Sequence, residues 1–211
     1  MEFETCIDFL NKQLSMPLPG EDAQYKMAPM KRKSRVEKYA SSPDAKHSSV
    51  LLLLYPENKN TNLVLIRRAI DNSHHSGQIA LPGGAVEAHD VDLKATALRE
   101  TEEEIGVALS KIAVHGSLTK LYIPVSNYWV HPFIGSVNHI PEFIPDDKEV
   151  DEVITYELSY FINSDIIKRH DFNTKSGFKI SAPYYQLEKD KLWGATAMIL
   201  SEFLEMLKIR Q

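Results

Sequence analysis

A stretch rich in glycine and glutamate, from Gly77 to Val107, constrains the fold and function of this chain more than any other. It opens with a Pro-Gly-Gly turn at residues 82–84, where glycine allows a sharp bend and a close approach of the backbone to a ligand. A predicted helix follows, and Gly106 stands where a left-handed residue is expected to end it. The turn, the helix and the glycine stop therefore predict one functional unit.

Three glutamates share one face of this predicted helix. Glu100, Glu103 and Glu104 are spaced so that an α-helix brings them to the same side. The other side carries the residues that we expect to pack in the core: Val91, Leu98, Thr101 and Ile105. Carboxylates so close together repel each other unless a cation lies among them, and oxygen ligands suit Mg²⁺ or Mn²⁺. A solvated acidic face is the alternative, but the flanking glycines favour a metal site.

The residues from Gly84 to Val107 resemble the Nudix box, which has a glycine, a spaced acidic residue and then R-E-U-x-E-E-x-G-U, with U apolar. Here the second half reads RETEEEIGV from Arg99 onward, with Thr101 at an apolar position. The interval from Gly84 to Arg99 is one residue longer than in the general box. This longer interval, together with the preceding SHHSGQIALPGG, is similar to the coenzyme A pyrophosphatase branch of Nudix hydrolases.

The resemblance implies roles for the glutamates. Glu100, Glu103 and Glu104 would bind the divalent metal, Mg²⁺ or Mn²⁺, that helps to neutralise and cleave a pyrophosphate. Glu103 or Glu104 would also accept the proton of the attacking water. Glu149 is the rival general base, because its loop reaches the cleft in Nudix relatives.

Other residues of the motif are expected to support the site. Arg99 would orient a carboxylate through a salt bridge, and Asp90 would either pair with Arg99 or cap the helix. The resemblance also implies substrate binding by three residues: Arg68, Gly83 and Gly84. Ser73 replaces an arginine that is usual in the coenzyme A branch, which affects the expected phosphate recognition. We expect the neighbouring His74 and His75 to be surface residues rather than metal ligands.

The order of predicted elements indicates an α+β fold. Apolar runs at residues 49–55 and 63–68 predict a hairpin, and a closing hairpin is expected at 178–187. Further strands are expected at residues 112–121, 128–137 and 153–158, and helices at 3–14 and from 194 onward. The resemblance implies a Nudix-type α/β/α sandwich with a mixed sheet. We assign residues 1–45 to an N-terminal helix and loop extension, and residues 46–211 to a Nudix hydrolase domain.

Composition narrows the classes of partner that we expect the protein to bind. A formal net charge of -5 gives no electrostatic case for nucleic acid, and no apolar stretch is long enough to span a membrane. Cys6 is the only cysteine, which is typical of a reducing compartment, so we expect a cytoplasmic protein. The expected partner is a small nucleotide substrate, and a homodimer is left open. The basic run at residues 31–35 is expected to be a solvated loop.

The resemblance implies hydrolysis of coenzyme A to phosphopantetheine and adenosine 3′,5′-bisphosphate. Aromatic residues at 128–133 would stack on the adenine or pack in the core, and the sequence leaves both open. The same site would also suit ADP-ribose or a dinucleotide as substrate. A different class of protein, a nucleotide-binding module without turnover, is disfavoured because Glu100, Glu103 and Glu104 are all present.

Overall fold

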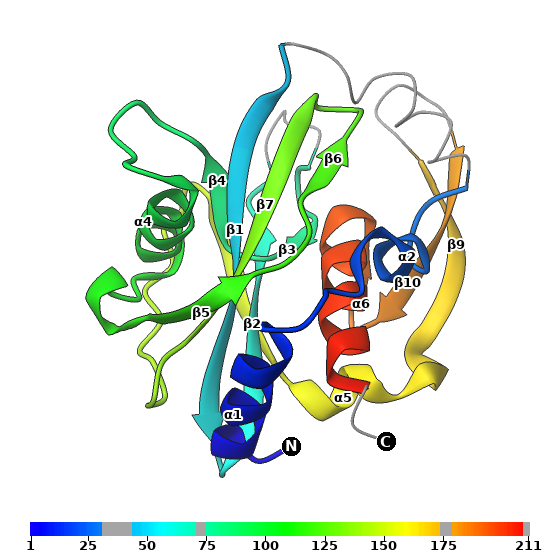
Figure 1. The fold of residues 1–211 in the computed structure, drawn as a ribbon. Coiled ribbons are helices and arrows are strands. Elements are labelled where there is room, and N and C mark those ends of the chain that lie inside the picture. The colour runs from blue at the N-terminus through cyan, green and yellow to red at the C-terminus, as the bar shows by residue number, and fades with distance from the viewer. Residues whose placement is uncertain (31–43, 71–74, 174–178, 209–211) are drawn as a thin grey trace.

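A mixed sheet forms the centre of the computed structural model, which describes residues 1–30, 44–70, 75–173 and 179–208 (Figure 1). Within these residues the sheet has eight strands. They are β1 (Lys46–Glu57), β2 (Asn60–Arg68), β3 (Ile79–Ala80), β4 (Gly83–Ala85), β5 (Ala113–Ser117), β6 (Leu121–Ile123), β7 (Tyr128–Ser136) and β8 (Val150–Glu157). The main order is β3-β2-β1-β7-β5, while β4 pairs with β1, β6 with β7 and β8 with β2. Strands β1 and β7 run parallel and the other pairs are antiparallel, which confirms the mixed sheet.

Helices cover both faces of this sheet. The helical elements are α1 (Phe3–Gln13), α2 (Gly20–Tyr25), α4 (Leu93–Ile105), α5 (Leu158–Ile162) and α6 (Gly194–Lys208), with short 3-10 turns at Leu109–Lys111 and Ser164–Ile166. A second sheet of β9 (Ile167–Asn173), β10 (Lys179–Gln186) and β11 (Lys191–Trp193) lies beside α6 (Figure 1). In the described part of the chain, every helix is too short or too polar to span a lipid bilayer.

The leucine run of β1 explains the layers. Successive strand residues point to opposite faces, so Leu51 and Leu53 pack with α4, while Leu52 and Leu54 join the core beneath α1 and α6. All four leucines are fully buried. Figure 1 shows α4 on one side of the sheet and α2 and α6 on the other, which confirms the α/β/α sandwich.

Most predicted elements are present, with three differences. The hairpin of β1 and β2 is confirmed, and its turn holds Asn58 and Lys59 at positive φ. The strand expected at 112–121 is two strands, β5 and β6, that pair with different parts of β7. The hairpin expected within 178–187 is wrong, because β10 is one strand that pairs with β9 and β11. Val91 was expected in the core but lies before α4 and is 89% exposed.

A buried glutamate of the last helix ties the N-terminal segment to the loop between β5 and β6. Glu202 of α6 is fully buried and accepts hydrogen bonds from Gln24 Nε2 at 2.8 Å and Thr119 Oγ1 at 2.7 Å. It also accepts the backbone N–H groups of Gly20 and Thr119, each at 3.2 Å. These donors come from segments far apart in sequence, so Glu202 joins three parts of the chain.

We expect Glu202→Ala to lower the free energy of unfolding by about 3 kcal/mol, because buried donors would lose a charged acceptor. Urea unfolding followed by circular dichroism measures the change. Glu205→Ala is the matched control, since Glu205 lies one turn away in a solvent-accessible salt bridge with Lys26 and should change stability by less than about 1 kcal/mol. Equal losses in the two variants would contradict the role of Glu202.

Candidate active site

The helix that carries the glutamates is fixed at both ends. Asp92 is its N-cap, and Oδ1 of Asp92 accepts the Ala95 N–H at 2.7 Å. Gly106 has a φ of 73° and donates its N–H to Glu102 O, which confirms the expected left-handed C-cap. Asp90 as the N-cap is wrong, because the cap position belongs to Asp92 and the helix starts at Leu93.

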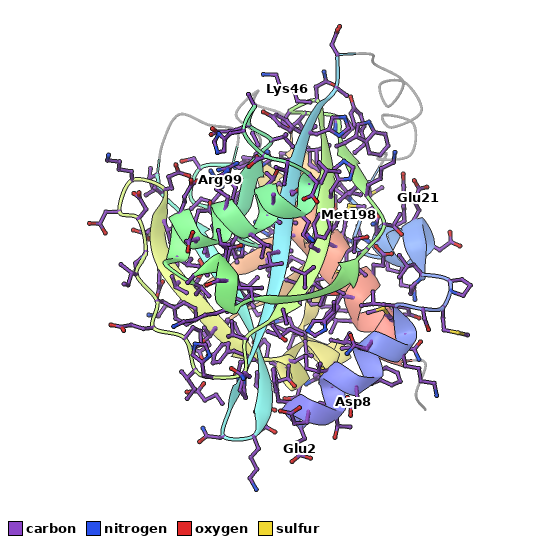
Figure 2. The ribbon with its side chains drawn as sticks, turned by 60° about the vertical axis from the view of Figure 1, so that its left-hand side comes forward. Glu2, Asp8, Glu21, Lys46, Arg99 and Met198 are labelled. Carbon is purple, nitrogen blue, oxygen red and sulfur yellow. The ribbon has the colours of Figure 1, made fainter. Side chains whose placement is uncertain are left out.

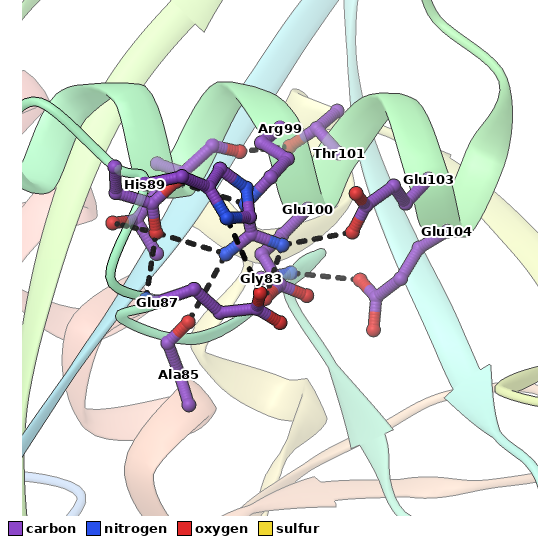
Figure 3. A network of polar contacts seen from close by, with 12 residues as sticks. Gly83, Ala85, Glu87, His89, Arg99, Glu100, Thr101, Glu103 and Glu104 are labelled. Atoms are coloured by element: carbon purple, nitrogen blue, oxygen red, sulfur yellow. Dashed lines mark hydrogen bonds and ion pairs between the residues drawn. The ribbon is translucent and has the colours of Figure 1, made fainter.

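Three carboxylates meet beside the sheet. Glu100 and Glu104 come from α4 and Glu149 from the residue before β8, and each offers an oxygen within 4.8 Å of the others. Pairing of β2 with β8 brings Glu149 there, since its carbonyl accepts the Ala69 N–H at 2.9 Å. Glu103 lies outside this group: its side chain is 59% exposed and bonds to Arg99 (Figure 3).

Glu104 is the most enclosed member of this group, with its side chain 1% exposed. Its Oε2 accepts the Gly83 N–H at 2.7 Å, and Oε1 lies 3.5 Å from Arg68 Nη1. Burial raises the pKa of Glu104 to about 8, and the charges of Glu100 and Glu149 add to this rise. The Gly83 N–H and Arg68 oppose it. The Glu104 carboxylate is therefore held in a fixed orientation. The positive charge near it is too small to offset the effect of burial on its pKa.

The electrostatic environment of Glu100 is similar to that of Glu104. Burial raises its pKa, the charges of Glu103 and Glu149 add to the rise, and Arg99 opposes it through Nη1 at 2.9 Å. A divalent cation among these oxygens would stabilise the ionised carboxylates that burial and mutual repulsion destabilise. All the donors are hard oxygens, so the residues fit such a cation.

Arg99 organises the other side of α4. Its Nε and Nη2 contact the two carboxylate oxygens of Asp90 at 2.9 and 3.0 Å, and Nη2 also donates to Ala85 O at 3.1 Å (Figure 3). Its Nη1 reaches both Glu100 and Glu103. This guanidinium holds the pKa of Asp90 well below its usual range. Arg99 therefore links the loop before α4 to the carboxylates of the helix.

The two glycines of the turn are needed for different reasons. Gly83 pairs with Val50 of β1 and has a φ of 146°, and a Cβ there would lie 2.6 Å from the Val50 Cα. Gly84 pairs with Ser49, and a Cβ there would lie 2.6 Å from Glu100 Oε1. The turn can therefore pair with β1 only because Gly83 lacks a side chain, and it can approach α4 only because Gly84 lacks one.

The remaining predicted residues are placed as follows. Arg68 is partly exposed at the end of β2 beside Glu104, whereas His75 is partly buried with its Nδ1 3.1 Å from Gln78 Oε1. Ser73, His74 and the basic run at 31–35 lie outside the described residues. Sequence reasoning missed a close pair of imidazoles from His47 and His131, although both strands were predicted, because no local motif links residues 84 positions apart.

The mixed sheet between helices, with a carboxylate-bearing helix packed against a Gly-Gly turn, defines a hydrolase site that fits a divalent cation. The chain belongs to the Nudix family: the NUDIX domain matches residues 45–172, which is more than half of its length. The family's members are pyrophosphohydrolases, as the motif from Arg99 to Val107 predicts.

Two relatives and two solved structures show how far the similarity extends. The chain is 29% identical over 168 residues to the Nudix hydrolase NudL of Photorhabdus laumondii, covering 80% of this chain and 88% of that protein. It is 31% identical over 147 residues to human mitochondrial coenzyme A diphosphatase NUDT8, covering 69% of this chain but only 62% of the human protein.

The M. smegmatis Nudix hydrolase RenU superposes with a TM-score of 0.54 at 16% identity, over 79% of this chain and 88% of RenU. A MutT/nudix family protein from Enterococcus faecalis gives 0.51 at 19% identity, over 92% of this chain and 76% of that one. The structures support the fold alone.

Proposed function

We propose that the protein hydrolyses the pyrophosphate bond of coenzyme A or its derivatives, giving phosphopantetheine and adenosine 3′,5′-bisphosphate. The observation that carries the reaction type is the meeting of Glu100, Glu104 and Glu149 beside the Gly83-Gly84 turn. The choice of coenzyme A is supported by the 31% identity to a coenzyme A diphosphatase and by the GQIALPGG segment.

We assign metal binding to Glu100, Glu104 and Glu149, with Mg²⁺ or Mn²⁺ as the cation. Glu103 is only the alternative ligand, because its carboxylate bonds to Arg99 and would first have to leave it. A bound cation would neutralise phosphate oxygens and lower the pKa of the attacking water. The buried N–H of Gly83 holds Glu104 in a fixed orientation, so this ligand would need little reorganisation on binding.

Proton acceptance is best assigned to the carboxylate oxygen of Glu149 that does not bind the cation, with Glu103 and Glu104 as the alternatives. Glu149 is exposed, whereas Glu104 is buried and already accepts a hydrogen bond from Gly83. A general base must reach both the water and the solvent to which its proton is lost. Arg99 acts as a positioning residue for Glu100, and Arg68 lies beside Glu104, where its guanidinium would meet an anionic substrate.

A panel of substrates tests the proposed function. We expect purified protein with Mg²⁺ or Mn²⁺ to cleave coenzyme A and its thioesters with a kcat/KM at least about tenfold above that for ADP-ribose or NADH. Chromatography of the products should show phosphopantetheine and adenosine 3′,5′-bisphosphate, and a chelator should abolish turnover. Turnover of ADP-ribose without coenzyme A would favour the alternative substrate. Nucleotide binding without turnover of any compound would favour a binding module.

The cellular location is also a proposal. We propose the cytoplasm, because a single buried cysteine, Cys6, offers no intrachain disulfide to an oxidising compartment. Cell fractionation with antibody detection tests this, and recovery in a membrane-enclosed compartment would contradict it.

A further inference from the structure

The face of the sheet that carries the acidic site continues from β4 across β1 to β7. Across β4, β1 and β7, the register aligns Gly84 with Ser49 and Ser49 with His131. Aligned residues of neighbouring strands project to the same face. A Cβ on Gly84 would meet the Glu100 carboxylate, so this is the face on which Glu100 lies. Figure 2 shows that Lys46, at the start of β1, lies toward the same end of the molecule as Arg99.

Two residues along the strands, the same face carries a group of rings and cations. His47 aligns with Trp129, and the rings of His47 and His131 stack with centroids 5.2 Å apart. Nδ1 of His47 lies 2.9 Å from Nε2 of His131, and Lys120 Nζ lies 4.5 Å from the centre of the Trp129 ring. We call His47, Lys120, Trp129 and His131 the histidine patch. His47 and Lys120 are exposed, and the other two are partly exposed.

Within the ranges that the structure describes, no carboxylate faces the ammonium group and the two imidazoles of the histidine patch. Among the described residues, neither Lys120 nor the two histidines form an ion pair with a carboxylate. The two imidazole nitrogens can share only one proton between them, and burial together with the charges of His47 and Lys120 lowers the pKa of His131. An anion placed here would be stabilised by the Lys120 ammonium group and by imidazole N–H groups that do not take part in the His47–His131 contact.

A buried hydroxyl beside the histidine patch is also unpartnered within the described part of the chain. Ser49 is fully buried, and its Oγ has no hydrogen-bond partner among the described residues. It lies in the row between Gly84 and His131, that is, between the acidic site and the patch. Neighbouring strands are about 5 Å apart, so the row spans roughly 10 Å from Gly84 to His131. One nucleotide can therefore extend from the acidic site to the patch.

We propose that the histidine patch binds a phosphomonoester of the nucleotide substrate, separate from the pyrophosphate that is cleaved, and so selects substrates that carry one. This inference rests on the proposed function, in which the leaving nucleotide is adenosine 3′,5′-bisphosphate. The pyrophosphate belongs at the carboxylates, where a cation can neutralise it. The 3′-phosphate needs a cation and hydrogen-bond donors of its own, and Lys120 with the imidazoles of His47 and His131 supplies them on the same face.

Selectivity between coenzyme A and 3′-dephospho-coenzyme A tests the inference. We expect the wild type to prefer coenzyme A by about tenfold in kcat/KM, the effect of one charge-assisted contact. In Lys120→Gln, and in the double variant His47→Gln with His131→Gln, this ratio should fall toward one. Lys111→Gln changes an exposed lysine in the 3-10 turn after α4 and should keep the wild-type ratio. A ratio near one in the wild type, or a ratio unaffected by the patch variants, overturns the inference.

A binding measurement separates this inference from the proposed function. Calorimetry with a chelator present compares adenosine 3′,5′-bisphosphate with 5′-AMP, which lacks the second phosphate, so no turnover is required. We expect the bisphosphate to bind about tenfold more tightly, and Lys120→Gln to remove the difference. If coenzyme A is not hydrolysed but this difference is found, the proposed function fails and the inference stands. If coenzyme A is hydrolysed but the bisphosphate and 5′-AMP bind equally tightly, the proposed function stands and the inference fails.

Discussion

Glu104→Gln is expected to lower kcat about a thousandfold, equivalent to about 4 kcal/mol, while the protein stays folded. The glutamine carbonyl can still accept the Gly83 N–H, so the local structure should persist. The variant loses the negative charge that we assign to the cation. Because burial raises the pKa of Glu104 to about 8, a neutral side chain also removes a desolvation cost. Thermal stability without metal should therefore be unchanged or higher, and it is measured together with kcat at saturating Mg²⁺.

Glu103→Gln is the matched control, because Glu103 lies next to Glu104 on α4 but bonds to Arg99 in solvent. We expect it to lose less than about tenfold in kcat. Mg²⁺ should raise the melting temperature of the wild type and of Glu103→Gln, but much less that of Glu104→Gln. If Glu103→Gln is as inactive as Glu104→Gln while Glu149→Gln is fully active, the ligands are those of the helix face alone. The assignment of Glu149 would then be withdrawn.

Helical periodicity could place the glutamates on one side of α4, but it could not predict which groups each carboxylate contacts. Glu100 and Glu104 turn inward, and the Gly83 N–H fixes the latter. Glu103 turns to Arg99, whose guanidinium also holds Asp90. These choices depend on a turn brought close by strand pairing. Local spacing carries no information about such contacts.

Glu149 illustrates the same limit over a longer distance. It lies far from α4 in sequence, and only the pairing of β2 with β8 brings it to the carboxylates. Resemblance to a family suggested it, whereas no pattern around it indicates catalysis. Of the two roles left open for Asp90, its contacts are those with Arg99, and the helix cap is Asp92. Asp90 and Asp92 are both good capping residues, and tertiary contacts with Arg99 engage the first of them.

The strands were predicted best where they are buried. The leucines of β1 form a continuous apolar run because both faces of this strand are covered, so the strand was evident but its two faces were not distinguishable. Strand β9, with the sequence IKRHDFN, is mostly exposed and polar, and it forms through pairing with β10. Helix α2 has only six residues, too few for a periodic pattern.

Gly84→Ala is expected to lower kcat/KM about a hundredfold with little loss of stability. The backbone at Gly84 pairs with Ser49 in an ordinary conformation, so alanine brings no backbone strain. Its methyl group would overlap the Glu100 carboxylate, which is the flexible end of a side chain and can move aside. Glu100 would then leave the group it forms with Glu104 and Glu149, and such displacement of a reacting group by about 1 Å can cost a hundredfold.

Gly83→Ala is the contrasting variant, because the obstacle there is backbone. Its methyl group would overlap the Ser49 carbonyl and the Val50 Cα, which cannot move without breaking the pairing of β4 with β1. We therefore expect Gly83→Ala to lose about 3 kcal/mol or more of stability, measured by urea unfolding, whereas Gly84→Ala loses less than about 1 kcal/mol. The double variant Gly84→Ala with Glu100→Gln should lose little more kcat/KM than the single variant Glu100→Gln. Both changes remove the same carboxylate from the site. Additive losses in that double variant would show that Gly84 acts by another route than Glu100.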